Sequence, residues 1–278
     1  MIESDAIVSK EIQYFSTNKI YHKEDLLAIE EPLEIHISFM RNGIRVTKSI
    51  SVTMRTPGQD EELSVGFLFT EGIIRHSKQL KSIPSGLLEN NKVLITLNDN
   101  ENPNLPATER NFYTTSSCGV CGKSSIDAIK TVSVFGKEND QIAVNPGILL
   151  NLTAELERQQ SIFKSTGGLH ASALFDLEGG FLMLREDVGR HNALDKAIGA
   201  LFLKDQLPLR NHILLLSGRA SFELIQKAGM AGIRIVVAIG APSSLAVELA
   251  EENNVTLIGF LRKETFNIYS GHERITAI

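Results

Sequence analysis

Cysteine is scarce in this 278-residue chain, which contains only two, and tryptophan is absent. Two cysteines are too few for a disulfide-stapled secreted scaffold, so a reducing cytoplasm is the expected location. Residues 1–5 are acidic where a secretion signal would be basic, and no signal-like apolar segment follows them. No uncharged run approaches the roughly 18 residues of a membrane span, so no membrane partner is expected.

An excess of positive charge is also lacking. The chain has 28 Lys and Arg against 33 Asp and Glu, a net charge of -5. Non-specific nucleic-acid binding depends on clustered Lys and Arg, so it is not expected as the main task. With 42% hydrophobic residues, the chain can bury a sizeable core in one large domain or two unequal ones.

Both cysteines, Cys118 and Cys121, lie in one short run of small polar residues and glycines, residues 116–122. A zinc site would need two further ligands, but the chain has no other cysteine and no close pair of histidines, so no metal is expected. Zinc deaminases carry a proline before the first cysteine and an earlier His-x-Glu. Here Ser117 takes the proline position and His170 comes later without a glutamate, which disfavours deamination.

Three interpretations of the cysteine pair remain open: a thioredoxin-type dithiol, two inert buried thiols, and nucleophilic sulfur. A helix-like pattern begins just beyond Gly122, and a helix N-terminus lowers the pKa of a nearby thiol. Lys123 adds a positive charge, and a glycine after each cysteine lets the backbone move. These features favour a reactive thiolate.

The first hundred residues predict a smaller α+β part, residues 1–107. Residues 1 to about 30 show no sustained period and are expected to form an arm of uncertain order. Alternating segments on either side of Asn42-Gly43 predict a β-hairpin. The remaining elements expected here are a helix over residues 61–74, a strand over residues 92–97 and a linker over residues 98–110.

The rest of the chain, residues 108–278, predicts an α/β domain. Its last part alternates short buried strands with helices, which is typical of a βαβαβ run and a parallel sheet. The expected strands are 213–216, 233–239 and 255–260, and the helices between them are 222–230 and 245–253. Upstream, the patterns predict helices over 124–132, 148–163 and 188–201, and a hairpin of residues 169–175 and 181–185.

Ligands of open parallel sheets bind beyond the carboxyl ends of the strands, where helix N-termini favour anions. Three turns at such ends, residues 217–219, 240–244 and 260–263, are therefore expected to form a pocket for a phosphorylated ligand. The alternative is that they are ordinary tight turns, which also favour Gly and Ser. Arg190 and His191, at the start of a helix, suit a polyanionic ligand. The alternative is that this cluster is structural, with Asp187 capping the helix and Glu186 pairing with Arg190.

Four motifs, in this order, resemble the formate dehydrogenase accessory sulfurtransferase (FdhD) family. Weaker matches over residues 67–74, 259–260 and 267–269 extend the resemblance over most of the chain. The third motif is long enough to be highly specific. The four motifs are Ser117-Cys118-Gly119-Val120-Cys121-Gly122, Thr166-Gly167-Gly168-Leu169-His170, Glu186-Asp187-Val188-Gly189-Arg190-His191-Asn192-Ala193-Leu194-Asp195-Lys196 and Ser217-Gly218-Arg219.

The resemblance implies a homodimer with a cytidine-deaminase-like mixed sheet but no deaminase chemistry. It implies a sulfurtransferase that takes sulfur from a cysteine desulfurase as a cysteine persulfide. The sulfur would pass to the molybdenum cofactor, bis-molybdopterin guanine dinucleotide, of formate dehydrogenase. Cys118 would be the persulfide carrier and Cys121 its companion. The alternative is a cofactor-binding chaperone or a dithiol redox protein without sulfur transfer.

The same resemblance places a nucleotide-cofactor segment after the last parallel strand. A free guanine nucleotide is expected to occupy the same site as the cofactor. The expected cofactor-binding residues are Phe260, Leu261, Arg262, Lys263, Glu264 and Thr265, together with Ser217, Gly218, Arg219, Gly240, Ser243, Arg190, His191 and His170.

Overall fold

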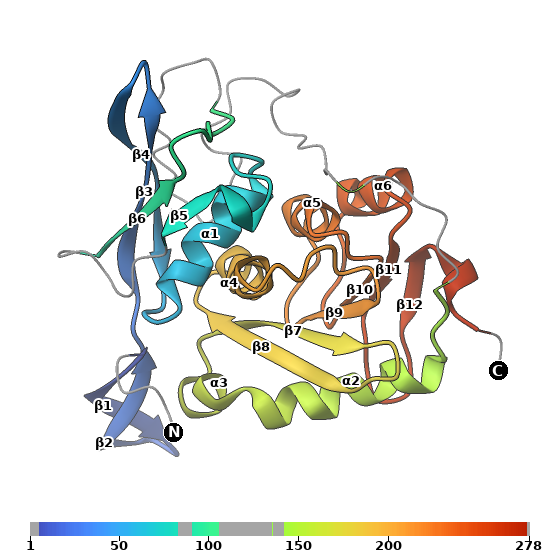
Figure 1. Cartoon of the computed structure of the whole chain (residues 1–278). Helices are drawn as coiled ribbons and strands as arrows, with labels where there is room; N and C mark the ends of the chain where they lie inside the picture. Colours follow the sequence, from blue (N-terminus) through green and yellow to red (C-terminus); the bar gives the residue numbers. More distant parts are fainter. Residues whose placement is uncertain (1–5, 83–90, 106–134, 136–141, 277–278) are drawn as a thin grey trace.

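The computed structural model of the chain describes residues 6–82, 91–105, 135 and 142–276 (Figure 1). Within these residues the fold is mixed α+β, with one two-stranded, one four-stranded and one six-stranded sheet, which confirms the expected fold class. Cys118, Cys121, the expected helix over 124–132 and the expected domain boundary at residue 107 lie outside the described residues. None of the helices in the described ranges is both long and apolar enough to cross a bilayer.

The four-stranded sheet has the order β4-β3-β6-β5. Its hairpin is confirmed, with Asn42 and Gly43 both in the left-handed region that a two-residue turn requires. Strand β6 is confirmed and runs parallel to β3, whereas the three-residue β5 is too short to leave a periodic signal. The strands are β3 (Glu31–Arg41), β4 (Ile44–Arg55), β5 (Leu80–Ser82) and β6 (Lys92–Leu97).

Helix α1 (Asp60–Thr70) follows this hairpin and is shorter than the prediction of residues 61–74. Gly72 takes a φ of 73°, and its N–H donates to the carbonyl of Phe69 at 2.9 Å. This left-handed residue ends the helix although the apolar residues Ile73 and Ile74 continue the pattern.

The six-stranded sheet has the order β12-β11-β10-β9-β7-β8. Its three central strands are parallel and are joined by α5 and α6, which confirms the βαβαβ run. The expected hairpin is β7 and β8, which adds to β9 antiparallel, and β12 adds antiparallel at the other edge. The elements are β7 (His170–Asp176), β8 (Phe181–Asp187), β9 (His212–Leu216), α5 (Phe222–Met230), β10 (Ile235–Ala238), α6 (Ser244–Glu252), β11 (Thr256–Gly259) and β12 (Asn267–Ser270).

The single helix predicted over residues 148–163 is wrong, because the chain forms α2 (Pro146–Gln159) and the short α3 (Ser161–Thr166). Gln160, with φ -70° and ψ 82°, breaks the helical path between them. The carboxylate of Glu186 accepts the backbone N–H groups of Ile162 at 3.1 Å and Phe163 at 2.9 Å. This buried acceptor on β8 fixes the start of α3 and could not be foreseen from local periodicity.

Residues 7–28 form a β-hairpin, which sequence periodicity did not predict. Strands β1 (Ile7–Ser16) and β2 (Lys19–Ala28) pair over their whole length and stand apart from the larger sheets, beside α3 (Figure 1). Most side chains on both faces are exposed. Because neither face lies against the core, the sequence has no apolar and polar alternation to mark the strands.

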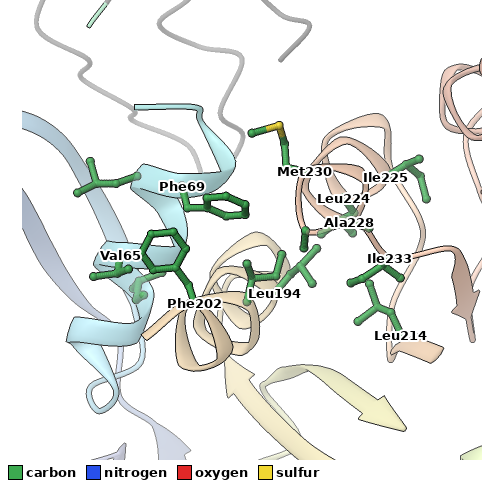
Figure 2. Close-up of a cluster of buried hydrophobic side chains, with 14 of the residues drawn as sticks. Val65, Phe69, Leu194, Phe202, Leu214, Leu224, Ile225, Ala228, Met230 and Ile233 are labelled. Atoms are coloured by element: carbon green, nitrogen blue, oxygen red, sulfur yellow. The ribbon is translucent and has the colours of Figure 1, made fainter. Parts of the chain in front are cut away.

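Helix α4 (Arg190–Leu203) crosses α1 at the centre of the molecule, and α5 packs beside them (Figure 2). Gly66 of α1 and Gly199 of α4 meet at the crossing, where a Cβ on Gly66 would overlap the carbonyl oxygen of Asp195. A Cβ on Gly199 would likewise overlap the carbonyl oxygen of Glu62. One hydrophobic core therefore continues from the four-stranded sheet to the helices over the six-stranded sheet.

We expect Gly66→Ala to destabilise the fold by about 1–3 kcal/mol or more, because the helices must move apart. Gly229→Ala is the matched control, since a Cβ there meets only Asn253 Nδ2 at 3.8 Å. The control should be neutral or up to about 1 kcal/mol more stable, because alanine favours a helix over glycine. Urea unfolding of both variants checks this, and equal stability of the two would contradict the crossing.

Candidate functional site

The three turns beyond the parallel strands lie side by side, as predicted. Gly240 N–H donates to the carbonyl of Gly218 at 2.9 Å, and Phe260 N–H donates to the carbonyl of Gly240 at 3.1 Å. A Cβ on Gly240 would lie 2.9 Å from the backbone nitrogen and Cα of Arg219, so this approach needs glycine. Backbone pairing thus continues past the strand ends and assembles one surface from the three turns.

A cavity of about 690 Å³ opens at this surface. Helices α2 and α3 line part of it, and residues 167–170, which precede and begin β7, line another part. The strand ends contribute Ser217, Ile239 and residues 261–263. A cavity of this size accommodates one nucleotide-sized ligand.

Arg262 and Lys263 supply positive charge to the cavity. Arg262 Nη1 donates to the carbonyls of Ile239 at 2.7 Å and Leu261 at 2.8 Å, and its backbone N–H donates to Thr265 at 2.8 Å. These bonds hold the stem of the guanidinium against the strand end, while Lys263 stays exposed. The pair therefore suits a ligand with phosphate groups.

Phe260 precedes this pair and has a φ of 53°, a strained conformation for a bulky residue. Its side chain is exposed and does not line the cavity. Glu264 and Thr265 complete the turn without lining the cavity. Strain of this kind gathers at ligand-binding segments, and only the structure reveals it.

His170 lies half-buried at the cavity, and its Nδ1 would be 3.3 Å from a Cβ on Gly218. Burial lowers the pKa of His170, the charge of Arg190 lowers it further, and Asp187 opposes both. The imidazole is therefore neutral at neutral pH. Arg190 lies close enough to act on His170 but does not line the cavity.

Asp187 is fully buried and holds the start of α4 in place. Its Oδ1 accepts the Gly189 N–H at 2.8 Å and Asn192 Nδ2 at 3.1 Å. Its Oδ2 accepts Lys196 Nζ at 2.8 Å and the Thr56 N–H at 3.1 Å. The long motif therefore ties β8 and α4 to the residues after β4.

A second buried ion pair involves Asp195 of the same motif. Lys227 Nζ on α5 donates to Asp195 Oδ2 at 2.9 Å and to Thr70 Oγ1 on α1 at 2.9 Å. Burial alone would lower the pKa of Lys227, but Asp195 and Glu71 raise it above its ordinary value. The charged pair therefore joins α1, α4 and α5.

His191 is buried and turned toward the start of α5, where its Nε2 lies 3.3 Å from Ser221 Oγ and 3.9 Å from Glu223. Ser243 accepts the Ala246 N–H at 3.3 Å and so caps α6. Neither residue lines the cavity.

Of the residues expected at the site, the structure brings His170, Ser217, Leu261, Arg262 and Lys263 to one cavity. Gly218, Arg219 and Gly240 shape its turns without lining it. Sequence reasoning missed the wall formed by α2 and α3, for which only the neighbouring glycines of the second motif gave a signal. The part of the chain that the structure describes contains no group of three or more His, Cys, Asp or Glu side chains placed to hold a metal. The missed lining residues are Thr153, Leu156, Glu157, Gln160, Phe163, Gly167, Gly168, Leu169 and Ile239.

Comparison with known proteins gives matches over nearly the whole chain. The model of the FdhD/NarQ family matches residues 28–276. A sulfur carrier protein FdhD of Mycobacterium tuberculosis is 44% identical over 98% of this chain and 99% of its own. A protein of the same name from Picrophilus torridus is 46% identical over 90% of this chain and 92% of its own.

A crystal structure from Desulfotalea psychrophila, of a protein proposed to be a formate dehydrogenase accessory protein, superposes with a TM-score of 0.75. It covers 98% of this chain and 100% of its own at 23% identity, so it supports the fold.

We expect the pKa of His170 to lie below the ordinary value of about 6.5 and to rise in Arg190→Met, because the variant removes a neighbouring positive charge. Arg190→Lys is the matched control and should keep the low value. Because the pKa of His170 is lowered in the folded chain, the unfolded chain binds this proton more readily. The free energy of unfolding therefore decreases as the pH falls below about 6.5. An NMR titration of the imidazole measures the pKa, and an unchanged value in Arg190→Met would contradict the contact.

Proposed function

The chain belongs to the FdhD/NarQ family, and on that premise we propose that it is a sulfur carrier, with Cys118 as the carrying residue. The observation that carries the proposal is the full-length match to sulfur carrier proteins in a chain whose only two cysteines form a Cys-x-x-Cys pair. The cavity at the strand ends supports a second element of the proposal, a binding site for the recipient of the sulfur.

Loading is an exchange between two sulfur chains. The Cys118 thiolate attacks the outer sulfur of a cysteine persulfide on a desulfurase, and a new S–S bond forms on Cys118. The S–S bond of the donor breaks, and the donor cysteine leaves as a thiolate. No electrons are gained or lost overall, so loading needs a thiolate and no oxidant.

Delivery differs from loading in its electron balance. The carried sulfur is neutral, so its release as sulfide takes two electrons. The Cys121 thiolate supplies them when it attacks Cys118 and closes a disulfide, which a cellular dithiol then reduces. This assigns Cys121 as the residue that completes delivery.

The proposed recipient is the molybdenum cofactor in its bis-molybdopterin guanine dinucleotide form, bound as a substrate before formate dehydrogenase receives it. Arg262 and Lys263 suit its phosphates, and about 690 Å³ suits one guanine nucleotide portion. The neutral imidazole of His170 and the hydroxyl of Ser217 suit hydrogen bonds to the nucleotide and add no charge to the cavity.

We expect one sulfur atom to be added to Cys118 when the full chain is incubated with a cysteine desulfurase and cysteine. Cys121→Ser should load, whereas Cys118→Ser should not, because only the former keeps the attacking thiolate. Peptide mass spectrometry under non-reducing conditions locates the added sulfur. A Cys118→Ala chain that still activates formate dehydrogenase would contradict sulfur transfer and leave a cofactor-binding chaperone.

We expect Arg262→Ala/Lys263→Ala to weaken binding of guanosine diphosphate by about 10–100-fold, because two phosphate-facing cations are lost. Calorimetry measures the affinity, and sulfur loading of the same variant should match the wild type. Arg158→Ala, which removes an exposed arginine paired with Glu155 on α2, is the control and should bind normally. Equal binding by the double variant would place the nucleotide elsewhere.

A further inference from the structure

The guanidinium of Arg190, the first residue of α4, makes no hydrogen bond or ion pair with the residues that the structure describes. Its Nε is buried and has no acceptor. A buried donor without an acceptor is costly, and native proteins contain few of them. Such a donor at the edge of a ligand cavity indicates that the ligand supplies the acceptor.

The two acids that precede Arg190 in its motif are already engaged. The oxygens of Asp187 accept four hydrogen bonds, from groups of α4 and from the residues before α1. The carboxylate of Glu186 accepts the N–H groups at the start of α3. The ion pair between Glu186 and Arg190 that the sequence allowed is therefore absent from the described residues, and the charge of Arg190 has no partner there.

His170 connects Arg190 to the cavity, because it feels the charge of Arg190 and lines the cavity together with Ser217. Within the described residues, nothing is hydrogen-bonded to its imidazole. Ser217 Oγ accepts the Ala171 N–H at 2.8 Å, which leaves the hydroxyl proton free to be donated. A guanidinium, an imidazole and a hydroxyl together suit one oxygen-rich anion.

We propose that Arg190, His170 and Ser217 form a subsite for a dianionic oxygen group, separate from the Arg262–Lys263 pair. Arg190 does not itself line the cavity, so this group lies at the cavity edge beside His170. The inference rests on the proposed function and deepens it, because the proposed recipient of the sulfur carries several anionic groups. The group held here is either a phosphate of the nucleotide portion or the anionic end of the ligand beyond the nucleotide.

Binding at this subsite is coupled to protonation of His170. In the free chain, burial and the charge of Arg190 lower the pKa of His170, and Asp187 opposes them. A bound dianion beside the imidazole raises this pKa, so the dianion binds more tightly as the pH falls. The other charged side chains around the cavity are Glu157 of α2 and the Arg262–Lys263 pair beyond β11. A substitution of Arg190 therefore isolates the contribution of α4.

Titration of the full chain with sulfate tests the proposal, because sulfate remains a dianion at every pH used. NMR of the imidazole follows His170, and sodium chloride at equal ionic strength corrects for screening. In the wild type, sulfate should raise the pKa of His170 and bind more tightly as the pH falls from about 7.5 to about 5.5.

Arg190→Met should weaken sulfate binding by about 10-fold or more, and sulfate should no longer move the pKa of His170, because the charged donor is lost. Arg158→Met is the matched control, since it removes an exposed arginine that pairs with Glu155 on α2, and it should respond as the wild type does. The Arg190 side chain makes no bond to the described residues, so the amide spectrum of the variant should show unchanged folding.

Guanosine diphosphate separates the two sources of the dianion. If it raises the pKa of His170 only where Arg190 is present and displaces sulfate, the subsite holds a phosphate of the nucleotide. If sulfate still acts on His170 in the nucleotide-saturated chain, the subsite holds the other end of the ligand.

A pKa of His170 that sulfate leaves unchanged in the wild type overturns the subsite, and so does an equal response in Arg190→Met. The measurement involves neither cysteine. It can therefore fail while Cys118 still accepts sulfur, and it can succeed where Cys118 does not.

Discussion

The close crossing of α1 and α4 is the constraint on which the rest of the structure depends. At Gly66 and Gly199 the two backbones touch, and a single methyl group on either would overlap a carbonyl of the other helix. Two buried ion pairs involve neighbouring residues of α4 beside the crossing, Lys196 with Asp187 and Asp195 with Lys227. Because buried charges are costly without partners, these pairs fix one arrangement of the helices.

This crossing positions the candidate site indirectly. Asp187 is the last residue of β8, and its carboxylate holds the start of α4. The charge of the same carboxylate also acts on the pKa of His170. The long motif thus has two tasks. Its aspartates, asparagine and lysine join the two sheets, while Arg190 tunes the histidine at the cavity.

Sequence patterns predicted the elements that bury one or both faces. The β3–β4 hairpin and the parallel strands β9–β11 have apolar periods that their burial explains. The strands of the β1–β2 hairpin were not predicted because both of their faces are exposed. The break at Gln160 was not predicted because Glu186, which fixes the start of α3, is distant in sequence. At the site, the glycine- and serine-rich turns marked the strand ends, but nothing local marked the α2–α3 wall or the strain at Phe260.

The central claim is that sulfur carried on Cys118 reaches a recipient held at the strand-end cavity. A single-turnover chase tests it most directly. The chain is loaded with radioactive sulfur, freed of donor, mixed with cofactor that lacks the sulfur, and then supplied with formate dehydrogenase that lacks the cofactor. The account predicts that the label moves to the cofactor fraction from the wild type, and that Cys121→Ser retains it on Cys118. Label that stays on the wild-type carrier while the enzyme becomes active would contradict the account.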